Sequence, residues 1–278
     1  MLISFAEQDE KMPIDVNVSE LKPLKNFGDG PPGSGSMLAL KLLLQTLDNI
    51  ILVNSTGTMT PFINGMPFVH AGPNAASVAR GVSQSGMTQN ASSRGEKGME
   101  KKPGTKVVAF AGDGATAMNL ASIANVKEDV LYVCANDFGY NAMNYKSERA
   151  LCRHVAGSAS YAATASVAHP EDYIVKLKKA HAMAGFRFIE VLCPSPESWG
   201  YEPSNTIEVG RVAVETGLWP LFEVENSVVT ITKRPNRLEP VESFNHVQKK
   251  FQIPSDKVQS VQEHVNRSWK MLGDGRLL

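Results

Sequence analysis

The stretch Lys106-Val-Val-Ala-Phe-Ala-Gly-Asp-Gly-Ala115 decides the fold class of this chain. Residues 107–111 form a short apolar run bounded by turn-forming residues, which is typical of a parallel strand covered on both faces. A second such run, residues 130–135, ends in Asn136-Asp137. Because ligands in an open α/β sheet collect at the carboxyl ends of strands, the two loops that follow these runs form a candidate site.

The residue types in the two loops suit a phosphorylated ligand and a metal ion. Gly112 and Gly114 let the backbone approach a diphosphate closely, and Asp113 offers a hard oxygen ligand to Mg²⁺. Asn136 and Asp137 add amide and carboxylate oxygens at the end of the next strand. The residues alone leave one alternative open, a surface Asp-Gly turn followed by an unrelated Asn-Asp turn.

Length and composition exclude several classes of function. A chain of 278 residues can form one large α/β domain, or one domain with extensions. Its formal net charge of zero argues against nucleic acid or an anionic membrane as the main partner. No apolar run approaches the about 20 residues of a membrane helix, and the start has no signal-peptide pattern, so we expect a cytoplasmic location. The 3 cysteines are too few and too scattered for a disulfide framework.

Strand-like and helix-like segments alternate along the chain, which predicts a doubly wound, mostly parallel α/β sheet. The predicted strands cover residues 50–54, 107–111, 130–135, 186–193, 218–223 and 228–232. The predicted helices cover residues 37–47, 74–87, 116–126, 173–183, 206–216, 241–251 and 255–272. Residues 145–164 lack periodicity and are expected to form a loop that could contact substrate.

The same pattern divides the chain into three parts. Residues 1–30 are punctuated by Pro and Gly and predict an extended N-terminal arm. Residues 31–235 contain the alternating segments and predict the α/β domain. Residues 236–278 are polar and helical in pattern, and predict a C-terminal extension.

Gly112-Asp113-Gly114 followed by an amide and acid pair resembles the thiamine diphosphate-binding motif. The resemblance implies that Mg²⁺ is bound by the side chains of Asp113 and Asp137 and by the carbonyl of Gly139. Asp137 stands where that family usually has asparagine, and the gap between the two halves is slightly short. Thr56 ends a predicted strand on the same side. The candidate cofactor contacts are Thr56, Gly112, Asp113, Gly114, Ala115, Asn136, Asp137, Gly139, Tyr140 and Asn141.

A wider resemblance runs through residues 28–250. Residues 38–41, 53–57, 107–114, 129–134 and 169–172 follow one another in the order found in a known family, and Val214-Glu-Thr-Gly-Leu-Trp-Pro-Leu221 is the most specific of these segments. The chain resembles the β subunit of pyruvate:ferredoxin oxidoreductase and related 2-oxoacid:acceptor oxidoreductases.

This resemblance implies a thiamine diphosphate-binding fold and the oxidative decarboxylation of a 2-oxoacid. Thiamine diphosphate and Mg²⁺ are the implied cofactors. The glutamate that activates the cofactor's aminopyrimidine is expected from an α-type partner subunit, so a hetero-oligomer is expected. Coenzyme A and a ferredoxin or flavin subunit are further candidate partners.

The chain departs from the family at the four cysteines that hold an iron–sulfur cluster. The matching positions are Pro31, Ser34, Thr58 and Ser195, none of which can supply the thiolate that a cluster needs. We therefore predict no iron–sulfur cluster in this chain. Three hypotheses remain: an oxidoreductase subunit whose electrons bypass this chain, a non-oxidative thiamine-dependent decarboxylase or carboligase, and a non-catalytic assembly subunit.

Two residues are candidates for catalysis. His70 precedes a predicted helix and could face the thiazolium ring or the substrate, although a structural imidazole fits the sequence as well. Asn141 lies in Asn141-Ala-Met-Asn144, where the family usually has Asn-Thr-Gly. The segment Gly28-Asp-Gly-Pro-Pro-Gly33 matches a dinucleotide fingerprint only superficially, because no strand precedes it and it contains two prolines.

Overall fold

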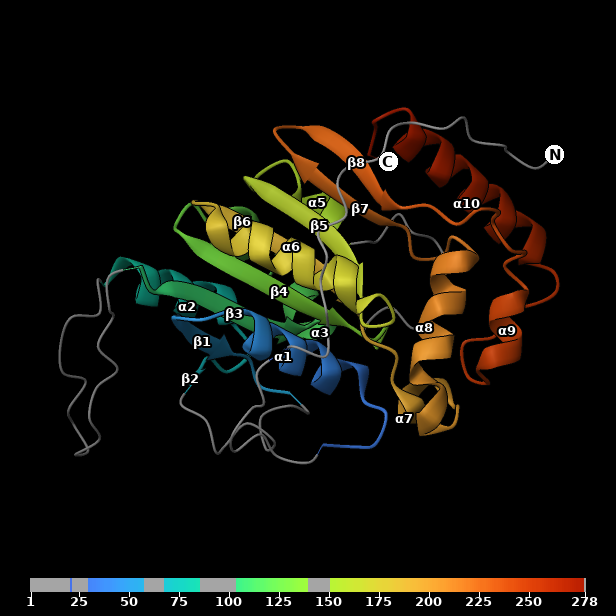
Figure 1. Ribbon diagram of the computed structural model, residues 1–278, viewed down its shortest axis with the longest axis horizontal. Helices are drawn as coiled ribbons and strands as arrows, with labels where there is room; N and C mark the ends of the chain where they lie inside the picture. The colour runs from blue at the N-terminus through green and yellow to red at the C-terminus, as the bar shows by residue number, and fades with distance from the viewer. Residues whose placement is uncertain (1–20, 22–29, 58–67, 86–103, 140–150, 278) are drawn as a thin grey trace.

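A mixed eight-stranded sheet forms the centre of the molecule in the computed structural model, which describes residues 21, 30–57, 68–85, 104–139 and 151–277 (Figure 1). The strands lie in the order β2-β1-β3-β4-β6-β5-β7-β8. Their bounds are β1 Ile50–Asn54, β2 Val69–His70, β3 Lys106–Gly112, β4 Val130–Asn136, β5 Tyr161–Ser166, β6 Phe186–Leu192, β7 Leu221–Glu225 and β8 Val228–Lys233. The first six are parallel, while β7 pairs antiparallel with both β5 and β8.

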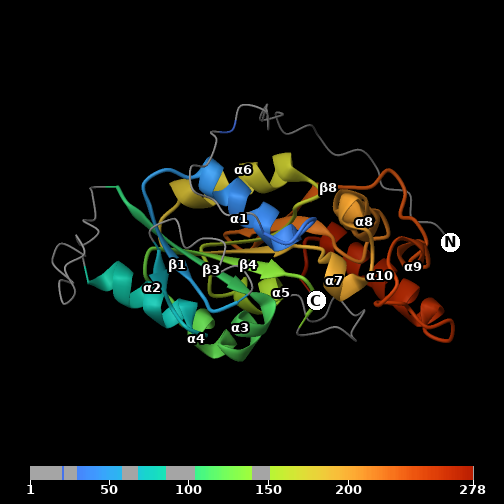
Figure 2. The same ribbon diagram turned by 90° about the horizontal axis from the view of Figure 1, so that it is seen from below.

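Helices cover both faces of the sheet (Figure 2). Their bounds are α1 Gly35–Thr46, α2 Ala75–Gln84, α3 Asp113–Met118, α4 Leu120–Ala124, α5 Leu151–Val155, α6 Pro170–Ala182, α7 Pro196–Trp199, α8 Thr206–Glu215, α9 Ser243–Val247 and α10 Val258–Gly273, with a 3-10 turn at Pro203–Asn205. Helices α1 and α6 pack on one face, and α2 to α5 pack on the other.

The central strands are buried on both faces, as continuous apolar runs require. Every residue of β4 and β6 is buried. A hydrophobic cluster lies on each face of the sheet, and alternate side chains of these strands enter one or the other. Val133 and Ile189 face α1 and α6, whereas Tyr132 and Phe188 face α2 to α5. The doubly wound, mostly parallel fold class is therefore confirmed.

Three local predictions differ from the structure. Residues 145–164 contain α5 and the buried strand β5, not only a loop. The helix predicted over 116–126 begins earlier, at Asp113, and breaks into α3 and α4 at Asn119, whose side chain donates to the carbonyl of Ala115. The helix predicted over 241–251 is only the short α9.

The C-terminal segment packs on the antiparallel end of the sheet. Val261, Val265 and Trp269 of α10 form a buried cluster against which Ile231 of β8 packs. The Trp269 indole also donates to the carbonyl of Gly217, with 3.1 Å between the two heavy atoms. The division at residues 30 and 235 stays a prediction. Within the described residues, no helix is long and apolar enough to cross a membrane.

Candidate active site at a topological switch point

The carboxyl ends of β1, β3 and β4 meet at one small cavity, which we call the switch-point cavity. The chain goes from β1 to β2 on one side and then to β3 on the other, and ligands collect at such reversals in open α/β sheets. The cavity has a volume of about 120 Å³. It is lined by Ser36, Asn54, Ser55, Thr56, Gly57, Phe110, Ala111, Gly112, Asp113, Ala115, Ala135 and Asp137. The structure thus brings together the predicted contacts Thr56, Gly112, Asp113, Ala115 and Asp137.

Asp113 enters the cavity from the first turn of α3. Its side chain is buried, and Oδ1 accepts the backbone N–H of Gly114 at 2.8 Å. The Thr116 hydroxyl donates to the carbonyl of Gly112 at 2.8 Å, which fixes the turn between strand and helix. A Cβ atom built on Gly112 would meet no atom of the chain within 4 Å. Packing therefore leaves open space in front of this backbone, as a closely approaching ligand requires.

Asp137 enters the cavity from a tight turn after β4. Its Oδ1 accepts the N–H of Gly139 at 2.9 Å, and a Cβ on Gly139 would lie 2.7 Å from that oxygen, so a larger residue there would displace the carboxylate. Burial raises the pKa of Asp137, although the Gly139 bond opposes the shift. No lysine or arginine in the described part of the chain forms an ion pair with this carboxyl group. A cation in the cavity would favour its ionised form.

The two carboxylates fit Mg²⁺ as part of a larger ligand set. In the described ranges, no group of three or more His, Cys, Asp or Glu side chains could hold a metal ion. Mg²⁺ is usually held by one or two carboxylates together with phosphate oxygens and water. Asp113 and Asp137 on one cavity therefore suit a Mg²⁺ ion that arrives with a diphosphate.

Trp199, which the sequence did not suggest as a site residue, holds the Asp137 turn from outside. Its indole N–H donates to the carbonyl of Asp137 at 2.7 Å. Its ring stacks on Phe138 with 5.4 Å between the centroids and 5° between the planes. Phe138 has a φ of 58°, which is uncommon for a residue other than glycine. The aromatic stack thus stabilises an unusual backbone conformation beside the Asp137 carboxylate.

Asn136 points away from the cavity and into the sheet layer. Its Oδ1 accepts the N–H of Phe138 at 2.8 Å, and its Nδ2 donates to Oε1 of Glu190 at 2.7 Å. Oε2 of Glu190 accepts the N–H of Cys152 at 2.8 Å, at the start of α5. Glu190 is fully buried, and burial raises its pKa to about 7. Asn136 therefore supports the turn instead of lining the cavity.

His70 lies at the sheet edge beside the cavity. Its Nδ1 accepts the N–H of Gly72 at 3.3 Å, so the neutral ring carries its proton on Nε2, which lies 3.5 Å from the Thr56 hydroxyl. His70 is exposed and does not line the cavity. It can orient Thr56, and its catalytic role stays a prediction. The predicted contacts Tyr140 and Asn141 lie outside the described residues.

Comparisons with known proteins identify the family of this chain. Residues 73–191 match the family described as "Thiamine pyrophosphate enzyme, C-terminal TPP binding domain". Pyruvate synthase subunit PorB of Methanothermobacter marburgensis is 32% identical over 279 residues, covering 85% of this chain and 92% of that protein. Ketoisovalerate oxidoreductase subunit VorB of Pyrococcus horikoshii is 30% identical over 278 residues, covering 86% of this chain and 89% of that protein.

The chain belongs to this family of 2-oxoacid oxidoreductase β subunits. It is thus a subunit of a thiamine diphosphate-dependent 2-oxoacid oxidoreductase, as the sequence predicted. A solved 2-oxoglutarate:ferredoxin oxidoreductase from Magnetococcus marinus covers 70% of this chain and 72% of its own, with a TM-score of 0.47 and 15% identity. That likeness is too low to add to the assignment.

Ser34 and Ser195, two of the positions predicted to have lost cluster cysteines, form what we call the capping corner. Ser34 is the N-cap of α1, and its hydroxyl accepts the N–H of Met37 at 3.3 Å. Ser195 is the N-cap of α7. The two segments touch, because the N–H of Gly35 donates to the carbonyl of Pro194 at 3.0 Å. Ser34 and Ser195, where we predict that cluster ligands are lost, thus serve as helix N-caps.

Of the three cysteines, Cys193 directly precedes Pro194 beside the capping corner, whereas Cys134 lies in β4 and Cys152 in α5. Cys134, Cys152 and Cys193 are all buried and free. Burial raises the pKa of each thiol well above its usual range. Cluster ligation needs thiolates, so these side chains are poorly suited to replace the missing ligands.

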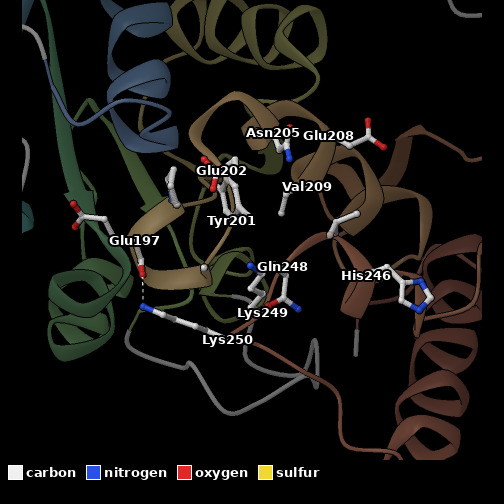
Figure 3. A pocket seen from close by; sticks show the side chains of 13 residues that line it. Glu197, Tyr201, Glu202, Asn205, Glu208, Val209, His246, Gln248, Lys249 and Lys250 are labelled. Carbon is white, nitrogen blue, oxygen red and sulfur yellow. Dashed lines mark hydrogen bonds between the residues drawn. The ribbon is translucent and has the colours of Figure 1, made fainter.

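A second cavity, of about 560 Å³, lies between α7, α8 and the segment after α9 (Figure 3). Glu197, Glu202 and Glu208 line it together with His246, Lys249 and Lys250, so both signs of charge are present. The Lys250 ammonium donates to the carbonyl of Glu197 at 2.6 Å, as the dashed line shows. None of the residues predicted for the site lines this cavity.

Proposed function

We propose that the switch-point cavity binds the diphosphate and Mg²⁺ of thiamine diphosphate. Bound thiamine diphosphate would supply carbanion stabilisation, which allows carbon dioxide to leave a 2-oxoacid. The side chains of Asp113 and Asp137 and the carbonyl of Gly139 hold the metal, and the open backbone at Gly112 accommodates the diphosphate. The observation that carries the proposal is the convergence of Asp113 and Asp137 on one cavity at the topological switch point.

In this proposal the chain acts with an α-type partner subunit, in the cytoplasm, on a 2-oxoacid. The related proteins are named as pyruvate synthase and ketoisovalerate oxidoreductase subunits, so pyruvate and branched 2-oxoacids are the first substrates to test. Coenzyme A and a ferredoxin or flavin subunit are the proposed acceptors of the acyl group and the electrons. His70 and Asn141 are proposed to contact the reacting groups.

We further propose that this chain holds no iron–sulfur cluster. Support comes from the helix-capping serines at two of the cluster positions and from three buried, protonated thiols. Electrons would then leave through a partner subunit.

The same replacements favour a second candidate function, a non-oxidative thiamine-dependent decarboxylase or carboligase. Loss of a nearby cluster removes the obvious electron exit, so the carbon dioxide could leave without oxidation of the product. Of the three hypotheses, a purely structural subunit fits least, because both carboxylates proposed to hold Mg²⁺ line the cavity.

The test uses the chain purified together with its native partner subunits. We expect 2-oxoacid-dependent release of carbon dioxide that needs thiamine diphosphate, Mg²⁺ and an added electron acceptor. Release without an acceptor would replace the first function with the second. Release that is independent of thiamine diphosphate would overturn both.

A further inference from the structure

Glu190 is a fully buried acid in the otherwise apolar central part of β6. Its register partners are Cys134 on β4 and Thr164 on β5. A carboxylate in such surroundings destabilises the folded state unless its oxygens are hydrogen-bonded. Here Oε1 accepts an N–H of the Asn136 amide at 2.7 Å, and Oε2 accepts the backbone N–H of Cys152 at 2.8 Å. The backbone N–H of Leu151 also bonds to this carboxyl group.

These bonds fix which way the Asn136 amide faces. Above its pKa of about 7, Glu190 is an acceptor-only carboxylate, so the amide Nδ2 must face it and Oδ1 faces the backbone N–H of Phe138, 2.8 Å away. A flipped amide would place an oxygen against Glu190 and a donor against Phe138. Both contacts would then be repulsive.

We propose that Glu190 is a positioning residue that acts through Asn136 to fix the turn from Asp137 to Gly139 in its metal-binding geometry. The inference rests on the proposed function of the switch-point cavity and deepens it. Glu190 holds the turn from inside the sheet, and Trp199 holds it from outside. Through Cys152, the same carboxylate also fixes the start of α5.

An exchange of the two side chains separates this role from a general effect on stability. In Glu190→Gln, one carboxylate oxygen becomes an amide donor, which must face either the Asn136 amide or the Cys152 N–H. In the double variant Glu190→Gln/Asn136→Asp, the introduced carboxylate can accept from both the introduced amide group and the N–H of Phe138. The oxygen of the introduced amide then accepts from Cys152, and the network is complete again.

The experiment measures Mg²⁺-dependent thiamine diphosphate binding in the complex with its native partners at about pH 8, where Glu190 is ionised, together with thermal stability. Glu190→Gln should weaken binding about tenfold or more, and the exchanged pair should recover to within about threefold of wild type. The matched control is Thr164→Val. Thr164 pairs with Glu190 in the sheet, and its buried hydroxyl donates to the carbonyl of Pro220. It should lower stability and leave cofactor affinity unchanged.

The single variant Asn136→Asp is measured as well. Wild-type cofactor affinity in Glu190→Gln would overturn the inference. So would a double variant whose loss of binding free energy equals the sum of the losses in the two single variants. If Glu190→Gln does not fold, the exchanged pair decides alone, since it should fold and bind. An exchanged pair that misfolds or fails to bind contradicts the network. Asp113→Ala is measured in parallel: normal binding there means that the proposed site itself is wrong, whereas lost binding there with unchanged Glu190→Gln refutes only the positioning role.

Discussion

The switch-point cavity and the capping corner lie side by side, because Ser36 of α1 lines the cavity and Ser34 caps the same helix. At the cavity, Asp113 stands where the family resemblance implies a carboxylate, and Asp137 offers an oxygen ligand where the family usually has asparagine. At the corner, Ser34 and Ser195 stand where the resemblance implies cysteines, while the backbone bond from Gly35 to Pro194 holds the segments together. In this account the same backbone arrangement keeps the thiamine diphosphate site while the neighbouring cluster site is lost, because each site depends on only a few side-chain ligands.

The largest predicted effect is at the cavity, for Asp113→Ala. Loss of the carboxylate removes a Mg²⁺ ligand, so we expect cofactor affinity to fall by about a thousandfold or more, ~4 kcal/mol. Isothermal titration of the complex with thiamine diphosphate, at a fixed Mg²⁺ concentration, measures this affinity. Asp256→Ala, at an exposed position before α10, is the control and should bind normally. If Asp113→Ala bound thiamine diphosphate as tightly as wild type, the switch-point cavity would not be the cofactor site, and it would no longer differ from the capping corner in function.

The second effect concerns the pH dependence of stability and comes from Glu190. Burial raises its pKa from 4.5 to about 7, with the nearby Asp113 acting in the same direction and the bonds from Asn136 and Cys152 opposing it. Between those values the unfolded chain ionises while the folded protein keeps its proton, so this contribution to stability is present below pH 4.5 and is lost as the pH rises to about 7. Arg153 also interacts electrostatically with Glu190, and an arginine side chain stays protonated throughout this range.

Urea unfolding of the cofactor-free protein at about pH 5 and about pH 8 measures this effect. Glu190→Gln lacks the titration, so the stability of wild type relative to this variant should fall by up to about 3 kcal/mol across the range. A difference that does not change with pH would show that Glu190 is ionised in the folded protein throughout.

A smaller effect is predicted for Trp199→Phe, which keeps an aromatic ring beside Phe138 and loses the N–H that binds the Asp137 carbonyl. We expect about 1–2 kcal/mol of lost stability and several-fold weaker cofactor binding. Trp269→Phe is a matched control, since it loses an indole bond to the carbonyl of Gly217 far from the cavity. Its stability should fall similarly with no change in cofactor affinity. Equal affinity in both variants would limit Trp199 to a packing role.

The smallest effect is predicted at the capping corner. Ser34→Ala and Ser195→Ala remove N-cap hydroxyls, so each should lower the free energy of unfolding by about 1 kcal/mol or less. Cofactor content should not change. A variant of either serine that lost iron or cofactor from the complex would mean that this corner still serves a cofactor.

The strands that carry the site could be predicted from the sequence because turn-forming residues stand directly at their ends. Residues 107–111 and 130–135 are apolar runs that stop at Gly and Asp or at Asn and Asp, and the structure extends each by only a few residues. Strand β5 was missed because Tyr161–Ser166 is rich in alanine and buried on both faces, which leaves neither alternation nor a β-branched run.

The supports of the site were beyond sequence reasoning because they are long-range contacts. Glu190 is one acid within an apolar strand, and its partners are 54 and 38 residues away in the chain. Trp199 meets the carbonyl of Asp137 across 62 residues. A lone acid in a strand that is apolar apart from Arg187 was the local signal, and it indicates a buried polar contact without naming the partner.

The central claim is that this chain keeps the thiamine diphosphate corner and has lost the cluster corner. The most direct measurement is the content of thiamine diphosphate, Mg²⁺, iron and sulfide in the complex and then in each separated subunit. The account predicts thiamine diphosphate and Mg²⁺ in the complex, with any iron and sulfide confined to partner chains. Iron and sulfide bound to this chain would contradict it.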